Sequence, residues 1–380
     1  MASPRDAVIS GIGLVSSLGE GVEAHLEALE GGHHRVDAST FAPYPVHPAV
    51  PLNWDLQIAK KADQRQMGAW QKLGVYAAGL ALTDAGLKGD KERLAEMELI
   101  VAAGGGERDY TVDEQILSGM TKSNAPDTYL NERLINDVRP TLFLAQLSNL
   151  LAGNISIVHG LTGGSCTLIG EEQAGIDALR VAVARIGARQ GDIFLVGGSC
   201  NAERPDILLH YAMDSMLWRG AFVPVFERIG KGGFIPGSGA AFLVLEAREH
   251  AEQRGAAPIA TVGSVGVNRV KRTAGAVGAS LENLWSKSAR NFDLKGGLIL
   301  SGATGVTGIT GEEQAALARL APGARLVATG DLFGHMIQCH LMAGAALAAA
   351  AVKAQRISEA VVSNVGHVRG EGLVLIGRAK

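Results

Sequence analysis

The residues best suited to chemistry in this sequence are a carboxylate and an imidazole, each at the start of a predicted helix. Glu172 opens the apolar-periodic segment 172–186, and His335 follows Gly334 at the start of the Ala-rich segment 335–352. A helix dipole favours a negative group at its N-terminus, and histidine is the commonest general base. Glu172 and His335 therefore have residue types and positions at which acid–base chemistry is possible. The plainer interpretation is structural, with a carboxylate held by backbone amides or an arginine and a histidine that begins a helix.

Metal and cofactor chemistry are not expected from the spacing of the ligand-type residues. His340 lies five residues after His335, outside the i,i+4 spacing of a shared helical metal site. Neighbouring positions on a helix face different directions, so Glu171 and Glu172 do not form a paired-carboxylate site. The cysteines form no CxxC motif, which indicates neither a zinc site nor a disulfide framework; they are Cys166, Cys200 and Cys339.

Short apolar runs alternate with helical segments along the chain. Buried strands are typically such continuous apolar runs, and their alternation with helices predicts an α/β architecture. The predicted strands are 7–10, 99–103, 155–158, 193–196, 241–245, 298–301, 360–363 and 373–376. The predicted helices are 22–29, 70–85, 172–186, 312–320 and 335–352.

A weak internal duplication indicates two similar halves in one compact body. Gly-rich turns at 163–170 and 330–334 each run into an Ala-rich helix, which leads to an apolar strand and a glycine turn. The glycine turn that follows the strand contains Gly197-Gly198 in the first half and Gly366 in the second. Two such halves packed together predict stacked layers with one central helix from each half.

Composition excludes several classes of protein. The chain has 380 residues, 47% of them hydrophobic, and a formal net charge of −3. That charge gives no electrostatic case for a nucleic-acid partner. The apolar stretch 341–352 is too short and too Ala-rich to span a membrane, and the first residues lack the pattern of a secretion signal. We therefore expect a cytoplasmic protein.

Several segments together resemble the β-ketoacyl-acyl carrier protein synthases, the condensing enzymes that extend acyl chains. The resemblance implies an α/β, thiolase-like, five-layered αβαβα fold built from two similar halves, residues 1–256 and 257–380. The matching segments are 8–32 (VISGIGLVSSLGEGVEAHLEALEGG), 84–87 (DAGL), 191–203 (GDIFLVGGSCNAE) and 226–256, which contains FERIGKGGF and LVLE.

The resemblance also implies which residues stand at the catalytic positions. The family uses a cysteine thiolate at the start of a buried helix and two histidines. Glu172, in TLIGEEQAG, stands at the nucleophile position, and Ala303 stands at the first histidine position. Gly334-His335 matches the second histidine. An alignment that makes Cys166 the nucleophile breaks the matches on both sides.

The resemblance further implies the contacts to substrate and partners. The turn 364–372 (NVGHVRGEG) matches the gatekeeper turn but lacks its aromatic residue. Basic residues are candidate contacts for the acidic carrier protein or its phosphopantetheine arm: Arg65, Arg133, Arg139, Arg269, Lys271 and Arg272. The implied substrate-binding residues are Gly197, Gly198, Phe234, Gly366 and His367.

The missing cysteine indicates a homologue that does not condense alone. Chain-length factors, which carry glutamine at this position, are the relatives it resembles. We therefore expect a protein that acts as the partner of a cysteine-bearing ketosynthase. It forms a heterodimer with that enzyme or a homodimer, and acyl carrier protein delivers the acyl chain. One alternative is a malonyl decarboxylase or acyl-thioester hydrolase that uses Glu172 and His335. Another is a homodimer that binds an acyl chain or carrier protein without chemistry.

Overall fold

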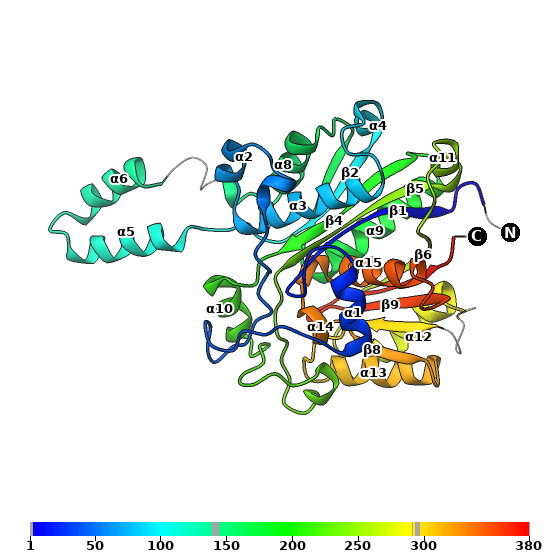
Figure 1. Cartoon of the computed structure of the whole chain (residues 1–380). Helices are drawn as coiled ribbons and strands as arrows, with labels where there is room; N and C mark the ends of the chain where they lie inside the picture. Colours follow the sequence, from blue (N-terminus) through cyan, green and yellow to red (C-terminus); the bar gives the residue numbers. More distant parts are fainter. Residues whose placement is uncertain (1–2, 139–143, 291, 293–296, 380) are drawn as a thin grey trace.

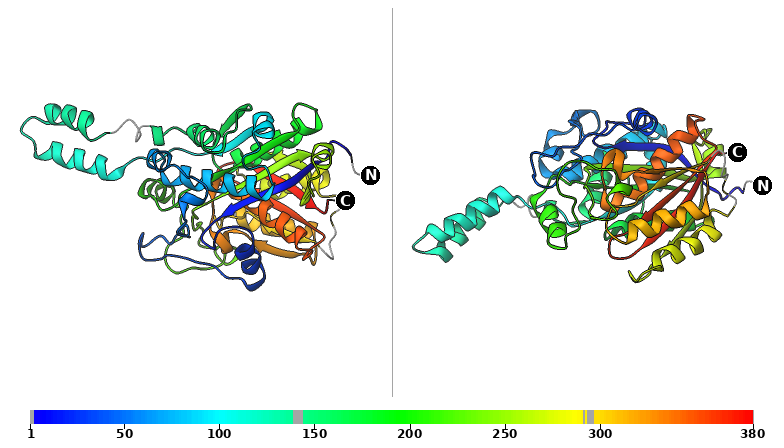
Figure 2. Two further views of the ribbon diagram at one scale, coloured as in Figure 1. Left: turned by 45° about the horizontal axis from the view of Figure 1, so that its top comes forward. Right: turned by 90° about the horizontal axis from the view of Figure 1, so that it is seen from below.

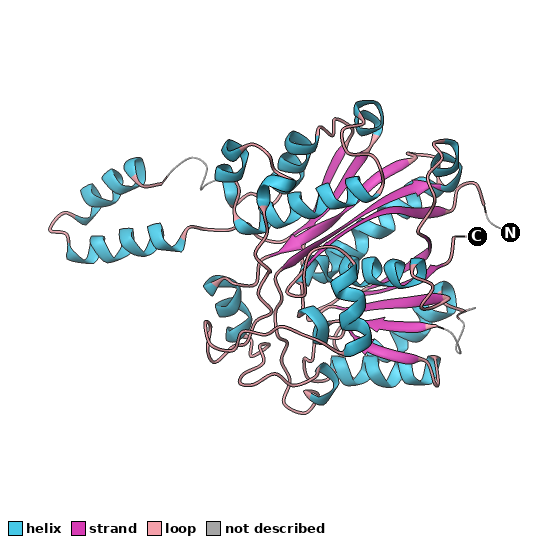
Figure 3. Ribbon diagram, in the orientation of Figure 1, coloured by secondary structure: helices cyan, strands magenta, loops and turns pink. Residues whose placement is uncertain are grey.

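A sheet of ten strands runs through the described part of the protein (Figure 3). The computed structural model describes residues 3–138, 144–290, 292 and 297–379. The strand order is β3-β2-β4-β5-β1-β6-β10-β9-β7-β8. The strands are β1 (Ala7–Val15), β2 (Glu98–Ala103), β3 (Ser165–Ile169), β4 (Ile193–Cys200), β5 (Gly239–Ala247), β6 (Ala260–Asn268), β7 (Leu298–Ser301), β8 (Arg325–Ala328), β9 (Glu359–Val365) and β10 (Glu371–Gly377).

The sheet consists of two sets of five strands with the same pairing pattern. β2 lies parallel to β3 and β4, and antiparallel pairs then join β4, β5 and β1. In the second set β7 lies parallel to β8 and β9, and antiparallel pairs join β9, β10 and β6. The sets meet where β1 pairs with β6, Ala7 opposite Val262. This repetition confirms two similar halves, while a boundary at residue 256 stays a prediction.

Helices form three further layers around the two sets of strands, as Figures 1 and 2 show. The central layer is α9 (Glu172–Gly187) against α15 (His340–Lys353), between the two sets. α3 (Ala69–Asp84) and α8 (Leu150–His159) cover the outer face of the first set. α12 (Ala276–Ser288) and α13 (Ile309–Leu320) lie outside the second. The predicted five-layered thiolase-like fold is therefore confirmed.

Glycine and alanine in the central layer let its elements approach closely. α15 is buried from His340 to Val352, as expected for a helix that is apolar all round. A Cβ atom on Gly175 of α9 would lie only 2.3 Å from the carbonyl oxygen of Gln338, much closer than atoms pack in protein interiors. Gly175 thus lets the first turns of α9 press against the segment that precedes α15.

The remaining helices include a hairpin that extends away from the layered body (Figure 1). This hairpin is α5 (Tyr110–Lys122) followed by α6 (Pro126–Asn136). No helix in the described ranges is both long enough and apolar enough to cross a membrane. The other helices are α1 (Glu23–Gly31), α2 (Lys61–Gln66), α4 (Lys91–Glu96), α10 (Pro205–Met213), α11 (Arg248–Gln253) and α14 (Gly330–Phe333), with short 3-10 turns η1 (Trp54–Leu56), η2 (Val225–Glu227) and η3 (Ile337–Cys339).

Several predictions about local structure were wrong. The apolar run 155–158 belongs to α8, where the side chain of Ile157 is 72% exposed; a short apolar run does not distinguish strand from helix. The helix predicted from residue 335 begins at His340, because positive φ angles at Gly334 and Ile337 interrupt it. The sequence patterns also missed β6 and β8, and β3 lies inside the segment predicted as a glycine turn.

Candidate functional site

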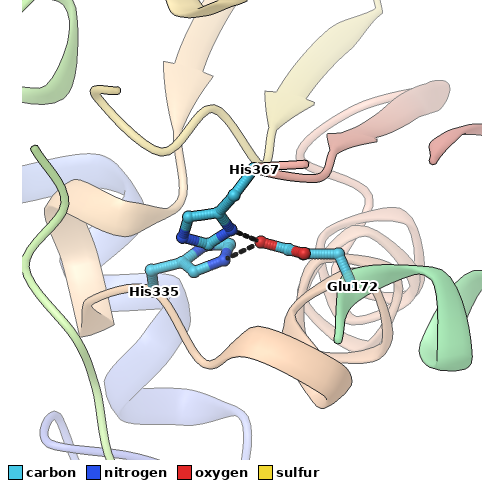
Figure 4. Close-up of side chains that lie close together, drawn as sticks. All are labelled: Glu172, His335 and His367. Carbon is cyan, nitrogen blue, oxygen red and sulfur yellow. Dashed lines mark hydrogen bonds and ion pairs between the residues drawn. The ribbon is translucent and has the colours of Figure 1, made fainter. Parts of the chain in front are cut away.

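Glu172 is the first residue of α9 and points into the centre of the protein. Its side chain is 1% exposed, and the preceding Glu171 forms no side-chain cap to the helix. The hydrogen-bonding and ion-pairing partners of its carboxylate are His335 and His367 (Figure 4). The prediction that backbone amides or an arginine hold this carboxylate was therefore wrong.

His335 approaches Glu172 from the segment between α14 and η3. Its Nε2 lies 2.9 Å from Oε1 of Glu172. The backbone of His335 is anchored in the loop before β5, since its N–H donates to Ile235 and its carbonyl accepts from Gly237. The backbone of Gly334 has φ +73°, which glycine adopts without steric cost. His335 thus precedes the central helix and is not its first residue, contrary to the prediction.

His367 approaches the same carboxylate from the turn between β9 and β10. Its Nδ1 forms an ion pair with Oε1 of Glu172. The turn is closed by the Gly366 N–H, which donates to the Gly370 carbonyl. Arg272 also holds it, with Nη2 donating to the Gly366 carbonyl at 2.6 Å and Nη1 pairing with Glu371. Arg272 therefore positions His367 and is not simply a contact for a carrier protein.

Two histidines around one buried carboxylate set the charges of the site. Burial alone raises the pKa of Glu172, but the charge of His367 and hydrogen bonds from both imidazoles bring it well below its usual value. Burial lowers the pKa of His335 despite its hydrogen bond to Glu172. At His367 the nearby carboxylate outweighs burial and raises the pKa. The carboxylate thus favours a proton on His367 over one on His335.

Aromatic rings enclose this triad of Glu172, His335 and His367. Phe234 packs edge-on against His367 with ring centroids 4.4 Å apart, and Tyr211 stacks on His367 at 5.4 Å and packs edge-on against Phe234 at 5.0 Å. Phe234, predicted as a substrate contact, therefore walls the triad. Tyr211 lies on α10, and no sequence pattern indicated its place here.

Three polar atoms of the triad have neither a hydrogen bond nor an ion pair among the described residues. They are Oε2 of Glu172, Nδ1 of His335 and Nε2 of His367. Imidazole nitrogen and carboxylate oxygen are common metal ligands, and one such atom from each triad residue lies within 4.8 Å of the others. Because His367 comes from a distant turn, the spacing of His335, His340 and Cys339 could not predict this cluster.

The other predicted site residues occupy different surroundings. Ala303 is buried in a small apolar cluster with Val225 and Ala328, so the implied first-histidine position carries a methyl group. Gly197 and Gly198 lie within β4 and not in a turn. A Cβ on Gly197 would lie 2.2 Å from the Ala241 carbonyl oxygen, so close strand packing accounts for this glycine. Contact of Gly197 and Gly198 with substrate stays a prediction.

The cysteines lie apart from the triad or in an unreactive state. Cys166 is exposed on β3. Burial raises the pKa of Cys200 to about 12 and the pKa of Cys339 well above its usual value. A thiol that resists ionisation is a poor nucleophile. The residue at the start of α9 is therefore a carboxylate, and neither buried thiol is suited to take its place.

Tyr211, which stacks on His367, also lines a cavity of about 470 Å³. Tyr211 and Glu171 line it together with Trp70, Gln338 and Ile169, the last residue of β3.

Among the predicted carrier contacts, Arg139 lies outside the described residues, and Arg269 pairs with Asp177.

Comparisons with known proteins agree on one family. Residues 5–251 match the family model of the β-ketoacyl synthase N-terminal domain. The chain is 26% identical over 264 residues to 3-oxoacyl-[acyl-carrier-protein] synthase 2 of Vibrio harveyi, covering 67% of this chain and 60% of that protein. It is 27% identical over 278 residues to the tetracenomycin polyketide synthase ketoacyl synthase beta subunit of Streptomyces glaucescens, covering 68% and 62%. The chain thus spans about six tenths of the length of these relatives.

Solved structures share the fold over the whole chain. The ishigamide ketosynthase/chain length factor superposes with a TM-score of 0.81 at 20% identity and covers 100% of both chains. A β-ketoacyl synthase from Burkholderia phymatum gives a TM-score of 0.79 at 20% identity, covering 99% of this chain and 100% of that one.

Proposed function

We propose that this chain, which belongs to the β-ketoacyl synthase family, is a subunit that does not condense acyl chains by itself. It pairs with a cysteine-bearing synthase and shapes the tunnel that holds the growing acyl chain, as a chain-length factor does. The acyl chain reaches this complex on the phosphopantetheine arm of an acyl carrier protein.

The binding of Glu172 by His335 and His367 carries this proposal. Family-type condensation needs an acyl group on a sulfur atom, and Glu172 has none. An acylated glutamate would be a mixed anhydride, which is hydrolysed more readily than it is attacked by a carbon nucleophile. Nε2 of His335 is already bonded to Glu172, so it is not free to assist decarboxylation of a malonyl thioester. Ala303 supplies no second base in its place.

The edge of the sheet supports a partner subunit. Among the described strands, β3 ends the strand order and pairs with β2 alone, so its outer backbone groups are available to another strand. The Ile169 side chain is 73% exposed at the end of β3 and also lines the 470 Å³ cavity. A second subunit placed against β3 would cover that side chain and extend the cavity across the interface. One similar protein is named a ketoacyl synthase beta subunit and one similar structure a ketosynthase/chain length factor, and both names favour this pairing.

The test is an elongation assay with acyl- and malonyl-carrier protein. The isolated protein is expected to form no elongated product, whereas its complex with a cysteine-bearing synthase from the same genome elongates the chain. Ile169→Lys is expected to weaken the complex, and Leu56→Lys is the control, because Leu56 is an exposed apolar residue of η1. Robust elongation by the isolated chain, or an acyl adduct on Cys166, would overturn the proposal.

The same assay separates the other functions. Release of carbon dioxide or free acid by the isolated chain, abolished by Glu172→Ala, would indicate a decarboxylase or thioester hydrolase. A homodimer that binds acyl carrier protein and ignores every synthase offered would indicate a binding module. Native mass spectrometry of the chain co-expressed with its genomic neighbours distinguishes a homodimer from a heterodimer.

A further inference from the structure

We infer that Glu172, His335 and His367 bind one divalent transition-metal ion, with Zn²⁺ as the ion that suits them best. One ligand atom from each residue lies within 4.8 Å of the others. Such a site requires no partner subunit and no condensation chemistry, so it stands or falls separately from the function proposed above.

The donor set is the first argument for an ion. Two imidazole nitrogens and one carboxylate oxygen are a known protein donor set for Zn²⁺, which leaves a fourth coordination position open. Imidazole also suits the neighbouring transition metals, whereas Mg²⁺ and Ca²⁺ prefer oxygen ligands. The triad therefore selects for a transition ion over the abundant hard cations.

Geometry is the second argument. Ligands held about 2.1 Å from a tetrahedral ion lie about 3.4 Å from one another. His335 Nε2 and Glu172 Oε1 are 2.9 Å apart, and His367 Nδ1 lies closer still to Oε1, so both imidazoles move away from the carboxylate when the ion enters. Figure 4 shows both imidazoles directed at the same end of the carboxylate.

The rigidity of the three supports is the third argument. Glu172 is fixed by the first turn of α9, where Gly175 presses against Gln338. His335 is pinned through its backbone to the loop before β5, and Arg272 clamps the turn that carries His367. Three separate elements thus hold the ligand atoms without the ion, which lowers the entropy lost on binding it.

An unpartnered carboxylate oxygen is an independent sign of a ligand at this place. Oε2 of Glu172 is buried and makes no hydrogen bond to the described residues. Buried polar atoms nearly always have partners. Oε2 can join Oε1 in binding the ion. When the ion takes Nε2 of His335 and Nδ1 of His367, each neutral ring carries its proton on the other nitrogen.

Metal content tests the inference directly. Protein purified without chelators from zinc-replete cells is measured by native and elemental mass spectrometry, in a Cys166→Ser background that removes an exposed thiol. About one Zn²⁺ per chain is expected. Chelated protein is then titrated with Co²⁺, whose visible absorption should show a tetrahedral or five-coordinate site. Glu172→Gln and His367→Phe are each expected to weaken Zn²⁺ binding at least ~100-fold, because each removes one of three ligands.

Two further variants guard against loss of fold. His159→Gln alters a buried histidine elsewhere, whose Nε2 contacts the Val75 carbonyl, and should keep full metal content. His367→Cys should restore Co²⁺ binding with a thiolate-to-metal absorption band. The inference is overturned if wild-type protein takes up neither Zn²⁺ nor Co²⁺, or if Glu172→Gln and His367→Phe, shown folded by circular dichroism, bind as much as wild type.

Discussion

The hydroxyl of Tyr211 donates a 2.8 Å hydrogen bond to Oε1 of Glu171, the residue immediately before Glu172. The ring of Tyr211 also stacks on His367 and lines the 470 Å³ cavity. Tyr211 therefore contacts both the cavity and the triad. The two adjacent glutamates have different surroundings, since Glu171 lines the cavity and Glu172 contacts the histidines.

Removing Glu172 from metal-free protein should destabilise the fold. Glu172→Ala leaves His367 without its counter-charge, so we expect a loss of roughly 3–5 kcal/mol in the free energy of unfolding. Urea denaturation at pH 7 with chelator present measures it. Because Glu172 and His367 interact directly, the double variant with His367→Phe should deviate from additivity by at least ~1 kcal/mol.

The exposed Glu27 provides the matched control for this cycle. Glu27→Ala should change stability by less than about 0.5 kcal/mol. Additive effects of Glu172→Ala and His367→Phe would contradict an energetic coupling between the two residues.

Restoring a thiol should not restore condensation. Glu172→Cys places sulfur at the start of α9, where the helix dipole favours the thiolate. Alkylation followed by mass spectrometry measures whether the thiol at residue 172 reacts. Ala303 still supplies no histidine, so the elongation assay should remain at background. Turnover by Glu172→Cys alone would mean that His335 suffices as the only base.

A buried carboxyl outside the triad should make stability depend on pH. Glu313 on α13 accepts hydrogen bonds from Ser301 on β7 and Ser363 on β9. Burial outweighs these bonds and the charge of Arg272, and raises the pKa of Glu313 to about 7. The folded state therefore holds a proton that the unfolded state releases near pH 4.5, so stability is fully present below pH 4.5 and falls as pH rises to about 7.

The size of this effect is roughly 3 kcal/mol, from a shift of between two and three pKa units. Urea denaturation from pH 4.5 to 8 should show it as the difference between wild type and Glu313→Gln, since other titrating groups cancel. Parallel stability curves for the two proteins would rule out a raised pKa at Glu313.

A methyl group on Gly366 should disturb the triad. A Cβ there would lie 2.4 Å from the Arg369 carbonyl oxygen and 3.0 Å from Oε2 of Glu172. Gly366→Ala should therefore cost about 1–3 kcal/mol through overpacking, measured by denaturation. Gly187→Ala is the control, because open space surrounds that position at the end of α9 and alanine favours the helix. Equal stability of the two variants would argue against tight packing at the turn.

The sequence predicted the layered fold because its signals are local. Apolar runs as long as β4 and β5, and glycine turns before α9 and α15, follow from the burial and backbone needs of single segments. The same signals failed at 155–158, where an apolar run formed part of α8, and at 335, where the start of the helix depends on the conformation of Gly334 and Ile337. The helical state of the first segment and the helix start in the second both depend on packing against other segments.

What the sequence determined by itself was the residue types: a carboxylate at the head of the central helix, a histidine after Gly334 and alanine at position 303. Tertiary structure decided what those residues face. His367 meets Glu172 across 195 positions of the chain only because β9 and β10 bring their turn against α9 and Arg272 holds it there. Convergence of this kind depends on the packing of whole layers, and sequence spacing along one element contains no information about it.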